Sequence, residues 1–135
     1  MSQPERLRIL YVDDELVNTR LVEAVIQYVL KRPDQVVTAN SGQQGLSALG
    51  SGHFDIVVSD QRMPDISGTE FLEHVRALQP DAVRVIVTGY TDDPDVRAAA
   101  ESGLAEAVIA KPWRAAELYA TLRAALGRRR GVSDP

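Results

Sequence analysis

Five polar side chains, each at the end of a short strand-like run, have the chemistry to bind a metal ion and a phosphate group. They are Asp13, Asp14, Asp60, Thr88 and Lys111. Neighbouring carboxylates repel one another and do not all stay ionised without a cation. Mg²⁺ suits them, because it prefers one or two protein carboxylates together with water and phosphate oxygens. The hydroxyl and the ammonium group bind phosphate oxygens, so the set predicts a site that moves a phosphoryl group by positioning and charge neutralisation.

Asp60 is the residue around which we expect this site to form. It directly follows the run Ile56–Ser59, and the pair Met63-Pro64 comes shortly after it and cannot continue a strand. The adjacent residues Val57 and Val58 indicate a strand that is buried on both faces of a parallel sheet. A carboxylate does not belong inside such a strand. Asp60 is therefore expected at its carboxyl end, the edge at which open α/β sheets bind ligands.

The elements that must position these side chains alternate regularly along the chain. Strands are expected at five apolar, β-prone runs: Leu7–Val12, Val36–Ala39, Ile56–Ser59, Val83–Thr88 and Ala107–Ala110. Helices are expected between and after them, from helical spacing and capping residues: Leu16–Leu30, Ser41–Leu49, Ser67–Leu78, Asp93–Ser102 and Ala115–Leu126. This order predicts an α/β fold, a doubly wound parallel sheet with right-handed crossovers and helices on both faces.

Each candidate residue also has an ordinary structural explanation when it is taken alone. An aspartate at the start of a helix is often its N-cap, and Asp60 could cap a turn. Thr88 is a common strand residue, and Lys111 before Pro112 could be a solvated loop residue. Because the carboxyl ends of parallel strands share one edge, a single shared site explains all of these positions together, and we adopt that interpretation.

Composition predicts a soluble, intracellular protein with one domain. The chain has 135 residues, 44% of them hydrophobic, and a net charge of −4 that argues against a dedicated nucleic-acid surface. It contains no cysteine, and neither a signal-peptide core nor a run of membrane-spanning length stands out. We expect a cytoplasmic domain over residues 1–127 followed by a flexible tail over 128–135, with no membrane contact and no direct binding to nucleic acid.

Four motifs in this order resemble those of the receiver domain of two-component response regulators, the chemotaxis-regulator type included. They are Tyr11–Glu15, Ser59–Pro64 with Gly68 following, Val87–Tyr90 and Ala110–Trp113. The resemblance covers about residues 7–126, nearly the whole chain. It implies a flavodoxin-like sheet with the strand order 2-1-3-4-5 and five helices.

The resemblance also implies a role for each candidate residue. Asp60 would be the phospho-acceptor, charged by a histidine kinase or phosphotransfer protein in a Mg²⁺-dependent reaction. Asp14 would bind Mg²⁺ directly and Asp13 through water, with Asp60 and the backbone carbonyl of Arg62 as further ligands. Thr88 and Lys111 would hold the phosphoryl oxygens and start the switch, and the Lys111-Pro112 bond would be cis. Such a domain is not a turnover enzyme, since it catalyses only its own phosphorylation and dephosphorylation.

Three positions shape what this chain would do after phosphorylation. Receivers usually carry an aromatic residue three positions before the lysine, but Val108 stands here and is stiff at χ1, so the usual switch is expected to be altered. Arg62 and Tyr90 occupy the rim of the site and are bulky, which predicts slow hydrolysis of the phosphoryl group. The switched surface, which would also mediate a homodimer, would comprise the fourth helix, the fifth strand and the fifth helix.

Three alternatives remain open from the sequence. A phosphohydrolase of the haloacid-dehalogenase type also uses a strand-end aspartate and Mg²⁺, but Asp60-Gln61-Arg62 lacks the second aspartate of that motif. A nucleotide- or flavin-binding module would need a glycine-rich loop after the first strand, which is absent. Finally, the motifs are similar to those of receivers in cyclic-di-GMP signalling proteins, so the chain could be a receiver excised from such a protein.

Overall fold

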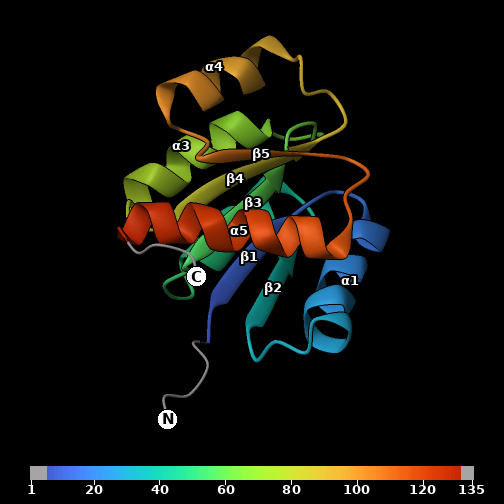
Figure 1. The fold of residues 1–135 in the computed structure, drawn as a ribbon. Coiled ribbons are helices and arrows are strands. Elements are labelled where there is room, and N and C mark those ends of the chain that lie inside the picture. Colours follow the sequence, from blue (N-terminus) through green and yellow to red (C-terminus); the bar gives the residue numbers. More distant parts are fainter. Residues whose placement is uncertain (1–5, 132–135) are drawn as a thin grey trace.

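The computed structural model describes residues 6–131, in which strands and helices alternate (Figure 1). The elements in chain order are β1 (Arg8–Val12), α1 (Leu16–Ala24), η1 (Val25–Val29), β2 (Gln35–Ala39), α2 (Gly42–Leu49), β3 (Ile56–Asp60), α3 (Gly68–Leu78), β4 (Val83–Thr88), α4 (Pro94–Ser102), β5 (Ala107–Ala110) and α5 (Ala115–Arg130). The strands form one parallel sheet in the order β2-β1-β3-β4-β5, which confirms the predicted fold.

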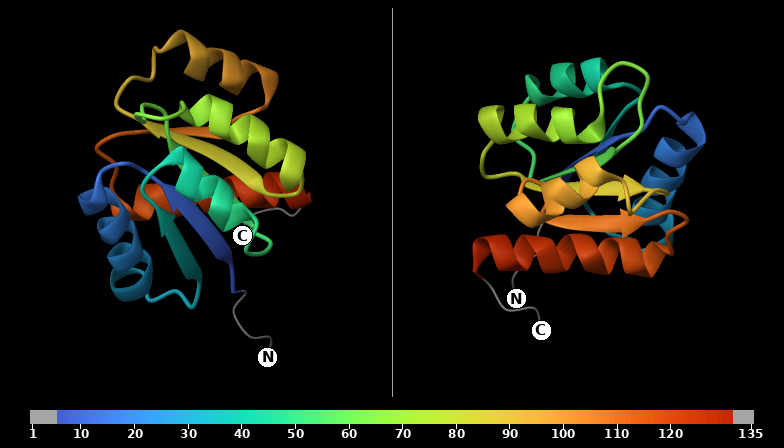
Figure 2. Two further views of the ribbon diagram at one scale, coloured as in Figure 1. Left: turned by 180° about the vertical axis from the view of Figure 1, so that it is seen from behind. Right: turned by 90° about the horizontal axis from the view of Figure 1, so that it is seen from above.

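Apolar side chains cover both faces of the sheet and form two hydrophobic clusters. On one face the strands pack against α1, η1 and α5, and on the other against α2, α3 and α4 (Figure 2). Alternate residues of β1 supply the two clusters: Ile9 and Tyr11 face one side, Leu10 and Val12 the other. All five residues of β3 are buried, as its adjacent valines predicted.

Side-chain caps start three of the helices close to the predicted positions. The Ser41 hydroxyl accepts from the Gln44 N–H, and the Ser67 hydroxyl accepts from the Glu70 N–H. The Asp93 carboxylate accepts from the first free amides of α4. No helix in residues 6–131 is long and apolar enough to cross a membrane.

Two segments differ from the sequence-based expectation. The helix predicted over Leu16–Leu30 is α-helical only to Ala24, and a π-helical turn, η1, completes it. The tail predicted from residue 128 is wrong for residues 128–130, which form the last turn of α5. Long-range contacts hold this turn, because the Arg129 guanidinium pairs with Glu106 and that of Arg130 lies 2.9 Å from Asp55. Residues 132–135 of the predicted tail lie outside the described residues.

Candidate functional site

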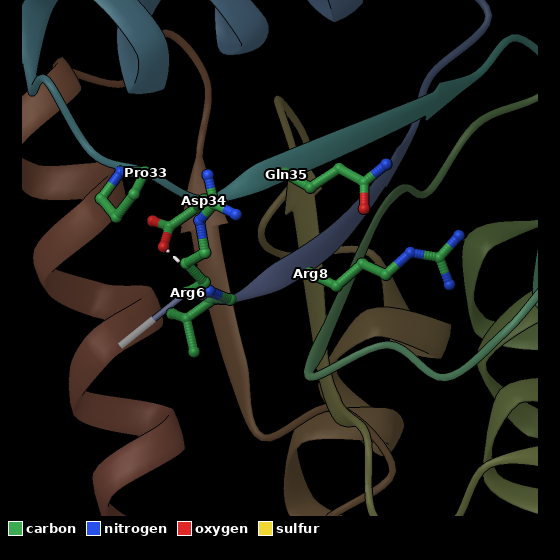
Figure 3. A pocket seen from close by; sticks show the side chains of 6 residues that line it. Arg6, Arg8, Pro33, Asp34 and Gln35 are labelled. Carbon is green, nitrogen blue, oxygen red and sulfur yellow. Dashed lines mark hydrogen bonds between the residues drawn. The ribbon is translucent and has the colours of Figure 1, made fainter. Parts of the chain in front are cut away.

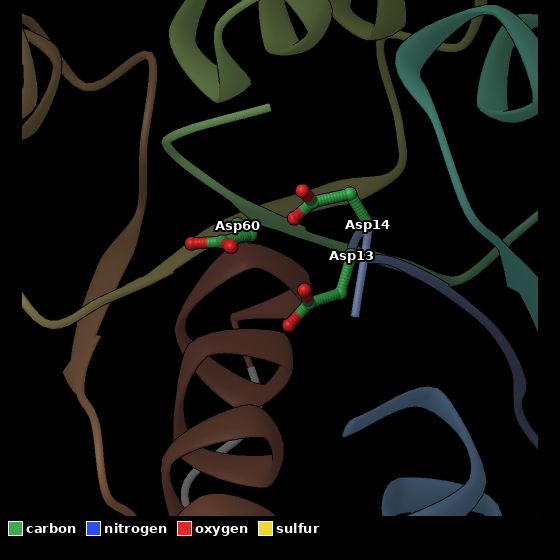
Figure 4. A group of neighbouring side chains, drawn as sticks. All are labelled: Asp13, Asp14 and Asp60. Carbon is green, nitrogen blue, oxygen red and sulfur yellow. The ribbon is translucent and has the colours of Figure 1, made fainter. Parts of the chain in front are cut away.

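Three aspartates meet at the carboxyl edge of the sheet. Asp60 ends β3, and Asp13 and Asp14 follow β1, the strand beside it. Each offers a carboxylate oxygen, and these oxygens all lie within 4.8 Å of one another (Figure 4). Asp13 and Asp60 are buried and Asp14 is exposed. The convergence predicted from strand ends is therefore present in the fold.

The two aspartates after β1 differ in how they are bonded. Asp13 accepts from the backbone N–H of Glu15 at 3.0 Å, the side-chain amide of Asn18 at 3.0 Å and the Lys111 ammonium at 2.9 Å. Asp14, by contrast, accepts no hydrogen bond within residues 6–131. Asp14 can therefore give its oxygens to a cation, whereas Asp13 is held in place by protein groups.

Lys111 links the carboxylates from the end of β5. Its Nζ lies 2.9 Å from Asp13 Oδ2 and 3.2 Å from Asp60 Oδ2. Burial lowers the pKa of Lys111, but the hydrogen bond and charge of Asp13, with the charge of Asp60, raise it overall. Lys111 is thus a cation at neutral pH. The Lys111–Pro112 peptide bond is cis, as the resemblance implies.

The surroundings of Asp60 raise the pKa of its carboxyl group. Burial raises its pKa, the charge of Lys111 lowers it, and the charge of Asp13 raises it again, so that the net direction is upward. The charge of Lys111 therefore does not offset the combined effect of burial and of the Asp13 charge on the pKa of Asp60. Two buried carboxylates beside an exposed one fit a divalent cation with oxygen ligands, which is the fit expected for Mg²⁺.

Thr88 brings a hydroxyl to the same edge from β4. The register pairs Asp60 with Val87, so that Thr88 lies one residue beyond Asp60 along the neighbouring strand. Thr88 is buried, and its Oγ1 accepts from the Tyr90 N–H at 2.9 Å. The hydroxyl is thus available near Asp60 and is already tied to the loop that follows β4.

Arg62 and Tyr90 contact each other directly across the rim. The Arg62 guanidinium carbon lies 3.5 Å from the centre of the Tyr90 ring, and Arg62 Nη2 lies 3.9 Å from Asp93 Oδ2. Both side chains remain largely exposed, at 59% for Arg62 and 51% for Tyr90. The stack joins the loop after β3 to the loop after β4. The sequence predicted that both residues lie on the rim, but it did not predict their contact.

Val108, in the position of the usual switch aromatic, lies in β5 beside Ile86 of β4. It is half-buried and packs against the cluster that contains residues of α3 and α4.

The hydrogen bond from the Asn18 side chain to Asp13 was not predicted from the sequence. The only signal for it is the place of Asn18 in the first turns of the helix after Asp13-Asp14, because the contact itself depends on how that helix is oriented.

A separate open pocket of about 440 Å³ lies at the opposite edge of the sheet (Figure 3). Arg8 and Gln35, the first residues of β1 and β2, line it together with Pro33 and Asp34. It contains none of the residues predicted to do chemistry. The carboxyl edge therefore remains the candidate site.

The comparisons with known proteins point to one family. The model of the response regulator receiver domain matches residues 9–123. A probable chemotaxis protein CheY from Rhizobium etli is 33% identical over 94% of this chain and 98% of its own length. The hydrogenase transcriptional regulatory protein HoxA from Cupriavidus necator is 35% identical over 87% of this chain, which spans only 24% of that protein.

Solved structures agree with these relatives. A CheY-like receiver domain protein from Methanospirillum hungatei superimposes with a TM-score of 0.84 at 25% identity, covering 94% of this chain and 98% of the other. The receiver domain of an HD domain-containing protein from Pseudomonas fluorescens superimposes with a TM-score of 0.78 at 27% identity, covering 97% and 94%. Fold and sequence therefore lead to the same group of proteins.

Proposed function

Because the chain belongs to the response regulator receiver domain family, we propose that Asp60 accepts a phosphoryl group from a phosphohistidine of a histidine kinase or phosphotransfer protein. The observation that carries the proposal is the Asp60 carboxylate, which meets the Lys111 ammonium at 3.2 Å and the Asp13–Asp14 pair within 4.8 Å. A nucleophile, a cation site and a group for phosphoryl oxygens then share one edge of the sheet.

The residues act in a simple order. An Asp60 oxygen attacks the phosphorus in line, the bond to the donor imidazole breaks, and the imidazole leaves with the electron pair. The Lys111 ammonium, which pairs with the Asp60 carboxylate before the reaction, then donates to one phosphoryl oxygen. The Thr88 hydroxyl donates to a second phosphoryl oxygen. Water later hydrolyses the acyl phosphate and restores the carboxylate. The domain catalyses only these steps on itself and is no turnover enzyme.

Asp14, Asp60, the Arg62 backbone carbonyl and, through water, Asp13 would hold Mg²⁺. When bound, the ion neutralises charge on the incoming phosphoryl group. The support is the donor set itself: oxygens within 4.8 Å of one another, with Asp14 free of protein hydrogen bonds within residues 6–131.

The proposed setting is the cytoplasm, with a receiver domain that extends to the end of α5 at Arg130 and binds neither membranes nor nucleic acid directly. Phosphorylation would change the surface of α4, β5 and α5 and thereby favour a homodimer or another partner.

A second candidate function is that of a receiver that works within a longer signalling protein. The similarity to the receiver of an HD domain-containing protein favours it, and the length of the native gene product tests it. The family match over residues 9–123 favours a receiver over a haloacid-dehalogenase-type phosphohydrolase.

The decisive experiment is labelling with acetyl phosphate in the presence of Mg²⁺. We expect one phosphoryl group per chain in the wild type, none in Asp60→Asn, and an unchanged level in Asp81→Asn, which alters an exposed carboxylate at the other end of the sheet. Labelling of Asp60→Asn at the wild-type level would refute the assignment of Asp60. Steady turnover of an excess phosphomonoester would favour the phosphohydrolase instead.

A further inference from the structure

The loop between β3 and α3, residues 61–67, carries the Arg62 carbonyl that would bind the metal ion. Its base is closed by Gln61, which is buried. The Gln61 side chain accepts from the Thr69 N–H at 2.9 Å, and its backbone carbonyl accepts from the Gly68 N–H at 2.8 Å. Gly68 has no room for a side chain, since a Cβ there would lie 2.3 Å from the Asp60 carbonyl oxygen. The base of the loop is therefore fixed beside Asp60.

The far side of the loop is fixed by a residue that contacts a different helix. The Asp65 carboxylate accepts from the Gly42 N–H at 3.1 Å and the Gln43 N–H at 2.8 Å, both at the start of α2. The hydrogen bond from Gln43 lowers the pKa of Asp65, burial opposes this, and the hydrogen bond from Gly42 lowers the pKa further, so that the net direction is downward. Ile66 lies so close that a Cβ on Gly42 would be 2.3 Å from its Cγ1.

Ordinary capping of α2 does not account for this contact. Ser41 already serves as the N-cap and accepts from the Gln44 N–H at 3.1 Å. Asp65 binds the two earlier amides, which Ser41 does not bind, and it comes from a loop more than twenty residues along the chain. The contact therefore has two effects: it satisfies two free N–H groups at the start of α2, and it fixes the position of the loop of residues 61–67.

We propose that Asp65 is a positioning residue for magnesium, which holds the loop of residues 61–67 against α2 so that the Arg62 carbonyl is in place before the ion arrives. The inference rests on the proposed function, because it needs Mg²⁺ at the aspartate cluster. A ligand that is already positioned loses less conformational freedom on binding. Linkage is reciprocal, so Mg²⁺ must in turn stabilise the contact between Asp65 and α2.

Calorimetric titration with Mg²⁺ tests the first half of this proposal. We expect Asp65→Ala to weaken Mg²⁺ binding on the order of 10-fold, the usual effect of losing a partner that orients a metal ligand. Asp65→Asn should fall between Asp65→Ala and the wild type, because it keeps an acceptor but loses the charge. Gly42→Ala perturbs the same contact from α2 by displacing Ile66 and should weaken binding as well. Asp92→Asn, an exposed carboxylate on another loop, should leave the affinity unchanged.

Amide hydrogen exchange followed by NMR tests the second half of the proposal. Mg²⁺ should slow exchange of the Gly42 and Gln43 amides in the wild type, and this protection should be lost in Asp65→Ala. Wild-type affinity in both Asp65→Ala and Gly42→Ala, or exchange at these amides that does not respond to bound Mg²⁺, would overturn the inference. Absence of Mg²⁺ binding to the wild type would instead refute the proposed function, so the two failures are distinguishable.

Discussion

The stack of Arg62 on Tyr90 joins the loops after β3 and β4 beside the site, and we expect it to affect how long a phosphoryl group on Asp60 would survive. Water must reach the phosphorus of phospho-Asp60 from the open side of the sheet edge. The two side chains contact each other at 3.5 Å, and Asp93 lies beside the guanidinium. A cation stacked on a ring at an exposed site is worth about 0.5 to 1 kcal/mol. The stack is therefore formed most of the time but opens readily.

We predict that Tyr90→Ala shortens the lifetime of phospho-Asp60 roughly two- to fivefold, the factor that corresponds to a stack of about 0.5 to 1 kcal/mol. Loss of label after removal of the phosphodonor measures this rate. Tyr90→Phe keeps the ring and should keep the wild-type lifetime. Equal lifetimes for Tyr90→Ala and Tyr90→Phe would show that the stack does not limit access of water, and a wild-type lifetime of seconds would contradict slow hydrolysis.

At this scale the sequence predicted those site residues that lie at strand ends, and it missed those that depend on contacts between elements. Asp13, Asp60 and Lys111 could be found because parallel strands bring their carboxyl ends to one edge. The roles of Gln61 and Asp65 could not, since their partners Thr69, Gly42 and Gln43 are set by how loops fold back. Hydrogen bonds of this kind leave no periodic pattern in the chain.

Among the elements, strands and capped helices were predicted well because their signals are local. The π-helical turn η1 was not, since five residues are too few to distinguish its spacing from that of an α-helix. The last turn of α5 was not predicted, because three consecutive charged residues, Arg128–Arg130, are typical of a solvated chain end. Contacts of Arg129 with Glu106 and of Arg130 with Asp55, far apart in sequence, keep this turn helical.

A hydrogen bond between α5 and the turn before β2 gives the fold a pH-dependent contribution. The Tyr119 hydroxyl donates to Asp34 Oδ2 at 2.8 Å. Burial, followed by the hydrogen bond to Asp34, raises the pKa of Tyr119 from 10.0 to about 12. Because the folded-state pKa is raised, this contribution is complete below pH 10 and is lost as the pH rises through 12.

We therefore predict that Tyr119→Phe lowers the free energy of unfolding by about 1.5 kcal/mol at neutral pH, the scale of a hydrogen bond to a charged group. The difference from the wild type should shrink between pH 10 and 12. Urea denaturation across this range measures it. Tyr28→Phe is the control, because Tyr28 is 71% exposed. A difference that stays constant up to pH 12 would contradict the assignment.

Across the whole molecule, the route that we propose from phospho-Asp60 to the surface of α4, β5 and α5 begins at Thr88. Its Oγ1 accepts from the Tyr90 N–H at 2.9 Å, and the Tyr90 ring carries Arg62. A phosphoryl oxygen that accepts from the Thr88 hydroxyl would draw this hydroxyl toward Asp60. The Tyr90 N–H bonded to the same oxygen would be drawn with it, and the loop that leads into α4 would respond. Val108 has no ring to exchange between two positions, and it already packs against the core. We therefore propose that the loop after β4 carries the change from the site to this surface.

We predict that beryllofluoride with Mg²⁺, a mimic of the phosphoryl group, raises the fraction of homodimer through α4, β5 and α5, and that Val108→Tyr enlarges this response. The added ring would supply a second group that moves with Thr88 and so widen the difference between the two states. Sedimentation velocity measures the dimer fraction, with Asp60→Asn as the variant that should not respond. Identical sedimentation of the wild type with and without the mimic would refute the dimer. An unchanged response in a folded Val108→Tyr variant would show instead that the loop after β4 carries the switch alone.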